Sequence, residues 1–82
     1  MRRLGLVLHI SPLSQNLIIK VERIPKIGET VIDEKLRPIG KVFDIFGPVS
    51  SPYAAVKPET RNVDELVGKI LYSLPSRRKG EG

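Results

Sequence analysis

The chain contains no cysteine and no tryptophan, and it has a single histidine among its 82 residues. Without cysteine, neither disulfide bonds nor thiolate metal ligands are possible. The one histidine, His9, lies in an apolar segment with no acidic residue close to it in the sequence, so it lacks the partner that would orient a catalytic base. These absences predict a protein that is not an enzyme and that has no metal site.

Long hydrophobic runs are also absent, since no apolar stretch approaches the roughly 20 residues that a transmembrane helix needs. The basic start Met1-Arg2-Arg3 is not followed by the hydrophobic segment of a signal peptide. The glycines form no phosphate-binding loop ahead of a long helix, so no nucleotide cofactor is predicted. We therefore expect a soluble, intracellular protein without a cofactor.

The positive charge lies mainly at the two ends of the chain. The sequence has 14 basic and 9 acidic residues and a net charge of +5. Five of the basic residues are Arg2, Arg3, Arg77, Arg78 and Lys79, which leaves the stretch between Leu4 and Ser76 nearly neutral. A nucleic-acid-binding fold usually carries clustered Lys and Arg within its body. This distribution favours little direct contact between the body of the protein and RNA.

Six short segments have the period-two apolar pattern of β-strands, and Gly- or Pro-containing turns separate them. A short helical turn is predicted between the last two, with Asn62 as its cap and Gly68 at its end. The number and spacing of the strands predict an all-β fold, a small closed six-stranded β-barrel of the translation-factor/reductase type over residues 1–75, with a basic flexible tail at 76–82. The expected strands are 4–10, 17–22, 30–33, 39–46, 52–57 and 69–74.

Alternation assigns faces to the strands. In the first strand it puts Leu4, Leu6, Leu8 and Ile10 on one side, and in the second it does the same for Leu17, Ile19 and Val21. In segment 39–46 the apolar alternation is imperfect. Gly40 also indicates a bulge or a close backbone approach, and a bulge there would reverse the faces of the residues that follow it. The sequence therefore leaves open which of Val42, Phe43 and Ile45 face the core. Asp44, between two apolar neighbours, is expected to be embedded and to accept hydrogen bonds from backbone N–H groups or from Lys41. Pairing of Asp44 with an arginine or lysine of a partner is the alternative.

Segment 46–53 is the strongest candidate for a functional surface. Gly47 provides a hinge, and Pro48 and Pro52 stiffen the turn, so little entropy would be lost on binding. Phe46, Val49 and Tyr53 are apolar anchors of a kind common in protein interfaces. Because so small a chain cannot bury all its apolar groups, this pattern favours a protein-docking surface. Two alternatives stay open: the aromatic rings plug the barrel end, or they stack on RNA bases.

The same residues carry a resemblance to a known family. Residues 40–49 (GKVFDIFGPV), with Pro52-Tyr53 and Val56-Lys57-Pro58, resemble the Gar protein of H/ACA ribonucleoproteins, which convert selected uridines to pseudouridine under a guide RNA. Arg3-Leu4-Gly5, Gly28, Val31 and residues 68–72 extend the similarity over most of the chain. The absence of Gly-Arg-rich extensions makes the chain similar to archaeal members, for which a cytoplasmic location is expected.

The resemblance implies a non-catalytic accessory subunit that docks on the catalytic domain of the pseudouridine synthase. It further implies control of the synthase loop for substrate loading and product release in rRNA pseudouridylation, with guide RNA contacted indirectly. The interface residues that we predict are Val42, Ile45, Phe46, Gly47, Pro48, Val49, Pro52 and Tyr53. A small RNA-binding or ribosome-assembly β-barrel is the alternative.

Overall fold

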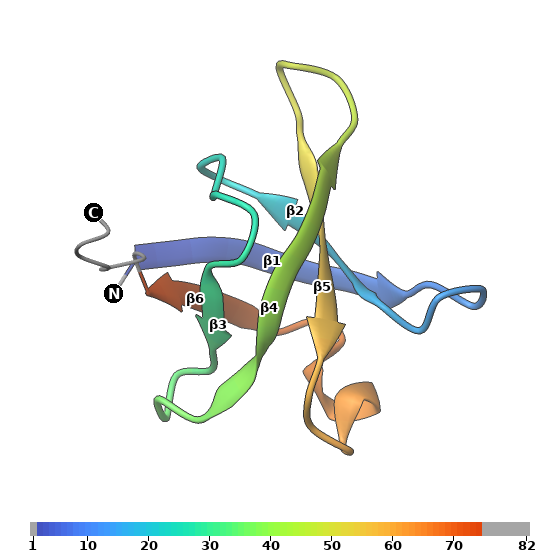
Figure 1. The fold of residues 1–82 in the computed structure, drawn as a ribbon, viewed down its shortest axis with the longest axis vertical. Coiled ribbons are helices and arrows are strands. Elements are labelled where there is room, and N and C mark those ends of the chain that lie inside the picture. Colours follow the sequence, from blue (N-terminus) through green and yellow to red (C-terminus); the bar gives the residue numbers. More distant parts are fainter. Residues whose placement is uncertain (1, 75–82) are drawn as a thin grey trace.

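Six antiparallel β-strands close into a barrel in the computed structural model, which describes residues 2–74 (Figure 1). The strand order is β1-β2-β5-β4-β3-β6, and β1 pairs with β6 to close the barrel, with Arg2 opposite Ser73. The elements are β1 (Arg2–Ile10), β2 (Leu17–Val21), β3 (Thr30–Ile32), β4 (Pro38–Phe46), β5 (Tyr53–Pro58), the 3₁₀ helix η1 (Val63–Leu66) and β6 (Ile70–Leu74). This confirms the predicted all-β, closed six-stranded barrel with one short helical turn. The predicted domain limit at residue 75 and the tail 76–82 lie outside the described residues.

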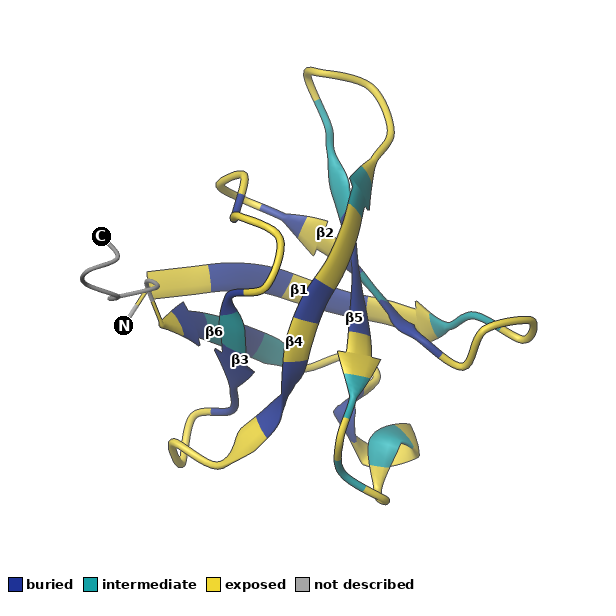
Figure 2. Ribbon diagram, viewed as in Figure 1, coloured by how far each residue is buried: buried dark blue, intermediate teal, exposed yellow. Residues whose placement is uncertain are grey.

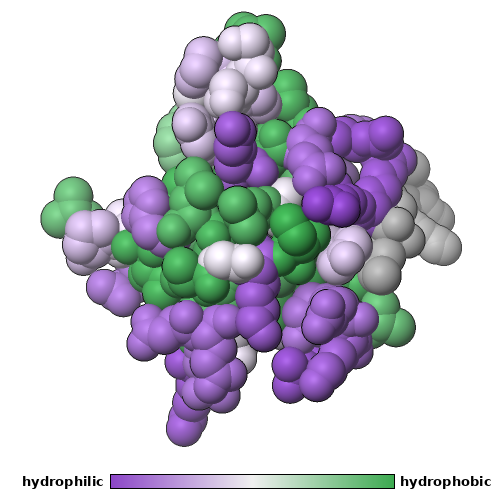
Figure 3. All heavy atoms as spheres, turned by 180° about the vertical axis from the view of Figure 1, so that it is seen from behind, coloured by the Kyte–Doolittle hydropathy of each residue, from purple (hydrophilic) through white to green (hydrophobic). Residues whose placement is uncertain are grey.

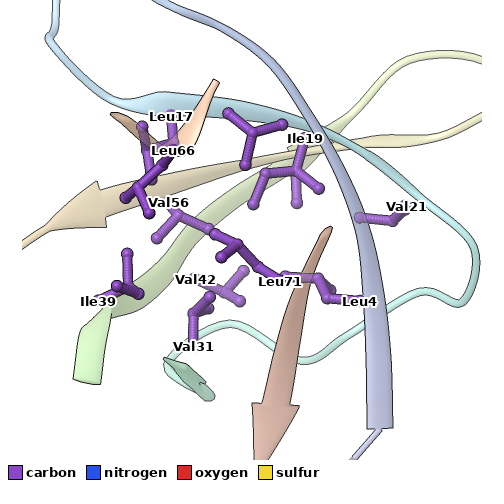
Figure 4. Close-up of a cluster of buried hydrophobic side chains, with 12 residues drawn as sticks. Leu4, Leu17, Ile19, Val21, Val31, Ile39, Val42, Val56, Leu66 and Leu71 are labelled. Atoms are coloured by element: carbon purple, nitrogen blue, oxygen red, sulfur yellow. The ribbon is translucent and has the colours of Figure 1, made fainter. Parts of the chain in front are cut away.

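The core fills the barrel interior with aliphatic side chains from all six strands and from η1 (Figure 4). Leu17 of β2 pairs with Val56 of β5, which in turn pairs with Val42 of β4, so one row of the core crosses three strands. The predicted inward face of β2 is confirmed, because Leu17, Ile19 and Val21 are all buried. The core contains no aromatic ring: its members are Leu4, Val7, Leu17, Ile19, Val21, Val31, Ile39, Val42, Ala54, Val56, Leu66 and Leu71.

Two bulges in β1 overturn the predicted face of that strand. The register with β6 shifts between Arg3 and Gly5, and the register with β2 shifts between Val7 and His9. Each bulge adds one residue and therefore exchanges inward and outward positions. Leu4 is consequently buried and Ile10 packs against the core, whereas Leu6 and Leu8, predicted on the same side, lie on the outer surface.

Strand β4 has the same construction and resolves the faces that the sequence left open. Its register shifts opposite Val31 and Ile32 of β3, and again between Val42 and Asp44 opposite β5. Because of the second bulge, Phe43 and Asp44 are both exposed, while Val42 on one side and Ile45 on the other face the core. The sequence prediction of a bulge or close approach near Gly40 is confirmed.

The helical turn differs in detail from the prediction. Asn62 makes no side-chain capping hydrogen bond, and η1 contributes the buried Leu66 to the barrel end. Gly68 follows the turn with φ of +87°, and its N–H donates to the Val7 carbonyl at 2.8 Å, which ties this segment to β1. In the described part of the chain, no helix is long and apolar enough to cross a membrane.

Asp33 organises the turn between β3 and β4. Its Oδ1 accepts hydrogen bonds from the backbone N–H groups of Lys35 and Arg37 at 2.8 and 2.9 Å, and its Oδ2 accepts one from Arg37 Nε at 2.8 Å. Burial raises the pKa of this carboxyl, but the hydrogen bonds and the Arg37 guanidinium outweigh burial and hold the pKa below its usual value. The ionised carboxylate therefore stabilises a turn in which Leu36 adopts a φ of +65°.

Candidate docking surface

The β4–β5 hairpin rises beyond the rest of the barrel, and its tip is exposed (Figures 1 and 2). The Ser51 N–H donates to the Pro48 carbonyl at 3.0 Å, which closes a four-residue turn with Val49 and Ser50 at its centre. The Val49 side chain is 93% exposed. A valine at a stiff tip, without intramolecular packing, is a ready anchor for a partner surface because little of the tip has to be ordered on binding.

A stacked aromatic pair lies at the base of this turn. Phe46 pairs with Tyr53 across the two strands, and their ring centroids are 5.8 Å apart with 28° between the ring planes. Gly47 lies against the Tyr53 ring, since a Cβ at this position would come 2.8 Å from Tyr53 Cδ2, and its φ is +96°. The hairpin thus needs glycine here both for the backbone angle and for the close ring.

The predicted interface residues divide into six that lie on the hairpin and two, Ile45 and Val42, that face the core. Six of them form the hairpin tip and its base: Phe46, Gly47, Pro48, Val49, Pro52 and Tyr53. Ile45 is half-buried and packs against the core from the base of the hairpin. The Val42 side chain, by contrast, is only 2% exposed and lies inside the barrel, because the bulge after it turns the next residue outward. Phe43, which was not among the predicted residues, is 59% exposed in its place.

Asp44 lies on the outer side of the hairpin base. Contrary to the expectation of an embedded carboxylate, it is exposed, and its Oδ1 accepts the Ile45 backbone N–H at 2.8 Å. The predicted type of hydrogen bond is therefore present, but burial is not. An exposed acidic group beside Phe43 gives the surface one charged position at which a basic residue of a partner can pair.

A second apolar area lies on the outer face of β1, visible at the centre of Figure 3. Leu6 and Leu8, each 37% exposed, face outward there because of the two β1 bulges. Leu6 pairs with Ile70 of β6 on one side and with Lys20 of β2 on the other. Lys20 pairs in turn with Tyr53, so one charged residue separates this area from the hairpin base. The exposed apolar surface is thus larger than the hairpin alone.

His9 is exposed on the outer face of β1, and across residues 2–74 no three His, Cys, Asp or Glu side chains gather to hold a metal ion. A cleft of about 420 Å³ near η1 is lined by three acidic and three basic residues together with apolar ones: Asp33, Glu34, Glu65, Lys35, Arg37, Lys69, Leu66, Ile70, Leu71 and Tyr72. The candidate contact surface is therefore the β4–β5 hairpin, with its closed turn and exposed apolar side chains.

Comparison with known proteins points to one family. A sequence model described as "Gar1/Naf1 RNA binding region" matches residues 1–79. A protein of Methanothermobacter thermautotrophicus, described as uncharacterized, is 34% identical, with 88% of this chain and 82% of the relative aligned. A second protein described as uncharacterized, from Methanocaldococcus jannaschii, is 43% identical, with 71% of this chain and 69% of the relative aligned. Both relatives are archaeal.

Proposed function

The chain belongs to the Gar1/Naf1 RNA binding region family, and on that premise we propose that it is a non-catalytic accessory subunit of an H/ACA ribonucleoprotein. The family is one of ribonucleoprotein components rather than of enzymes. In this proposal the β4–β5 hairpin docks on the catalytic domain of the pseudouridine synthase subunit. The docked barrel then controls the synthase loop that governs substrate loading and product release.

The observation that carries this proposal is the exposure of the hairpin's apolar side chains. Val49 is 93%, Phe43 59% and Phe46 43% exposed, and all three lie on this one hairpin. Exposed apolar groups that cluster on a rigid element are typical of protein interfaces. The turn hydrogen bond and the aromatic stack hold these groups in place before any partner arrives.

Control of a partner's loop follows from differential contact. The hairpin can contact one conformation of the loop more extensively than the other. The free-energy difference between the two conformations then shifts in favour of the first by the difference between their binding free energies. About 1.4 kcal/mol of difference shifts the ratio tenfold. The barrel itself then contributes no reacting group, and its effect appears only in the steps that the loop limits.

The aromatic pair argues against base stacking at this site. Phe46 and Tyr53 stack on each other, so each ring already has one face covered by its partner. Stacking platforms for single-stranded RNA present free ring faces among several basic residues. Here the nearby cations are Lys20, opposite Tyr53, and the Lys41–Lys57 pair farther along β4 and β5. A protein partner fits the hairpin better than an RNA base does.

The test compares two loop-tip substitutions in a pull-down and in calorimetry against the purified synthase of the same organism. Val49→Asp puts a charge at the centre of the proposed contact and is expected to weaken binding at least about thirtyfold, the loss typical of an interface hot spot. Leu13→Asp, in the β1–β2 loop, alters a side chain that is 95% exposed and is the matched control. Equal affinity of the two variants would refute docking through the hairpin.

A kinetic experiment separates docking from loop control. With the wild-type barrel, multiple-turnover pseudouridine formation is expected to be faster than without it, while the single-turnover rate on preloaded substrate RNA changes little. Val49→Asp is expected to reproduce the rates measured without the barrel. An equal effect on both rates would place the barrel's influence on the chemical step and would contradict the proposed loop control.

A further inference from the structure

Three arginines meet at one end of the barrel, away from the hairpin tip. Arg2 and Arg3 begin β1, and Arg23 is the second residue after β2. The antiparallel pairing of the two strands, with Gly5 opposite Val21, brings these residues together although about 20 positions separate them in the sequence. They line a cleft of about 320 Å³ whose fourth lining residue is Glu22.

The cleft is strongly polar and carries an excess of positive charge. Three of its four lining residues are arginines and the fourth is a glutamate, so one ion pair cannot neutralise their charge. Arg3 Nε lies 2.9 Å from Glu22 Oε2, and both side chains are more than half exposed, so this pair is a weak one. Among residues 2–74, Arg2 and Arg23 take part in no ion pair.

The other basic residues are placed differently. In the cleft near η1, three cations face three carboxylates, and Arg37 is held by Asp33. That cleft is balanced and needs no external anion. The arginine cleft lacks such balance, and solvent together with mobile counterions must compensate its charge. A ligand that carries several negative charges would release those counterions on binding.

We propose that the arginine cleft is a contact site for the phosphodiester backbone of RNA. Guanidinium groups bind phosphate oxygens through paired hydrogen bonds, and three arginines that line one cleft provide several such donors to an RNA strand. All four lining residues are charged, so the cleft offers no aromatic ring on which a base could stack. The contact therefore reads charge and spacing, and it is blind to base identity.

This site goes beyond the proposed docking and does not depend on it. The arginine cleft is built from β1 and the residues after β2, whereas the hairpin joins β4 to β5. One surface would hold the synthase and the other would touch RNA of the same particle. The amount of direct RNA contact is then small and confined to one end of the barrel, consistent with the near-neutral body.

The first test measures fluorescence anisotropy of labelled oligouridine with the full chain at several salt concentrations. The variant Arg2→Gln/Arg23→Gln leaves the Arg3–Glu22 pair intact and alters only exposed side chains. Wild-type binding is expected to weaken with salt. In the variant, the slope of log affinity against log salt should fall by about 1.4, because each phosphate that an arginine no longer neutralises accounts for about 0.7.

The matched control is Arg61→Gln/Lys69→Gln, which removes the same charge from exposed positions around η1, where Asp64 and Glu65 also lie. The control is expected to keep the wild-type slope. An equal fall of the slope in both variants would show that net charge, and no site, governs binding. Absence of salt-dependent oligouridine binding by the wild type, or binding to anionic lipid vesicles alone, would also overturn the proposal.

A second test predicts a gain, rather than a loss, of oligouridine affinity. Glu22→Gln removes the one carboxylate of the cleft and frees Arg3, so oligouridine affinity is expected to rise by up to about fivefold. A destabilised protein cannot produce this gain. Unchanged or weaker binding would refute the site, whereas synthase binding by both arginine-cleft variants is expected to equal that of the wild type. Failure of the proposed RNA contact can therefore be distinguished from failure of the proposed docking through the hairpin.

Discussion

Gly40 of β4 lies directly against the backbone of Lys57 in β5: a Cβ added to Gly40 would come 2.1 Å from the Lys57 carbonyl oxygen. Gly5 of β1 has the same relationship to Lys20 of β2, also at 2.1 Å. Each glycine lies on one of the two nine-residue strands, next to a bulge. Both close approaches therefore lie beside bulges, which bend a strand and help a sheet to close.

Gly40→Ala is expected to lower the free energy of unfolding by about 3 kcal/mol or more, because the clash is with backbone and β4 must move away from β5. Gly28→Ala is the control. Gly28 has a φ of +92° but nothing within 4 Å of the added atom, so a loss of about 1 kcal/mol is expected from backbone strain alone. Urea unfolding of both variants measures the difference. Equal losses would show that β4 and β5 can separate without cost.

Alanine substitutions at Val42 and Val49 are expected to affect different properties, since Val42 lies in the core and Val49 at the exposed hairpin tip. Val42→Ala removes two methyl groups from the core, where the side chain is 2% exposed, and is expected to cost about 2 kcal/mol. Val49→Ala alters a side chain that is 93% exposed and should change stability by less than about 0.5 kcal/mol. Urea unfolding and synthase binding are measured for both. Val42→Ala should bind normally while folded; a loss of affinity without a loss of stability would place Val42 in the interface.

The stack between Phe46 and Tyr53 should contribute to the rigidity of the hairpin. A double-mutant cycle with Phe46→Leu and Tyr53→Leu is expected to give a coupling free energy of about 0.5–1.5 kcal/mol in urea unfolding. The same cycle in synthase affinity reports whether the ordered hairpin matters for docking. A coupling of zero in unfolding would mean that the rings pack independently.

The carboxylate of Asp33 makes stability depend on pH. Because its pKa in the native state lies below the unfolded value, its ionised form stabilises the fold above about pH 4, and this contribution disappears as the pH falls through the native pKa. Asp33→Asn is expected to cost about 1–3 kcal/mol at pH 7, since an amide cannot accept from both backbone N–H groups and Arg37.

The cost of Asp33→Asn should shrink when unfolding is measured below pH 4, where the wild type loses the same interactions. The exposed neighbour Glu34 provides the control, and Glu34→Gln is expected to have a small effect at either pH. A difference between the wild type and Asp33→Asn that stays constant from pH 7 to pH 3 would contradict the assignment of this carboxylate.

The number of strands, most of their boundaries and the barrel class could be predicted from sequence, because these depend on local apolar periodicity and on turn residues. The face of β2 followed from the same rule, since no bulge interrupts that strand. The faces of Leu6 and Leu8 could not be predicted, since a bulge depends on register with a distant partner strand rather than on the strand's own pattern.

The hairpin was predictable because glycine, proline and aromatic residues mark it within eight consecutive positions. Val42 and Phe43 were not, because one inserted residue decides which of two adjacent apolar side chains points outward. The sequence does contain a signal for this bulge. Lys41 and Asp44 are both polar and exposed although three positions separate them, which strict alternation does not allow. A bulge that puts Phe43 and Asp44 outward in succession accounts for this spacing. The arginine cleft was invisible to sequence reasoning, because it depends on the pairing of β1 with β2.

The pairing of Arg2 with Ser73 also has a practical consequence for engineering. A short peptide linker from Leu74 back to Arg2 would join neighbouring strands, and the ring could then be reopened in the exposed β1–β2 loop near Leu13 without cutting a strand. Such a circular permutant would preserve every strand of the barrel and would leave the former ends free of tags, so that fluorophores or affinity handles could be carried on a different side of the protein.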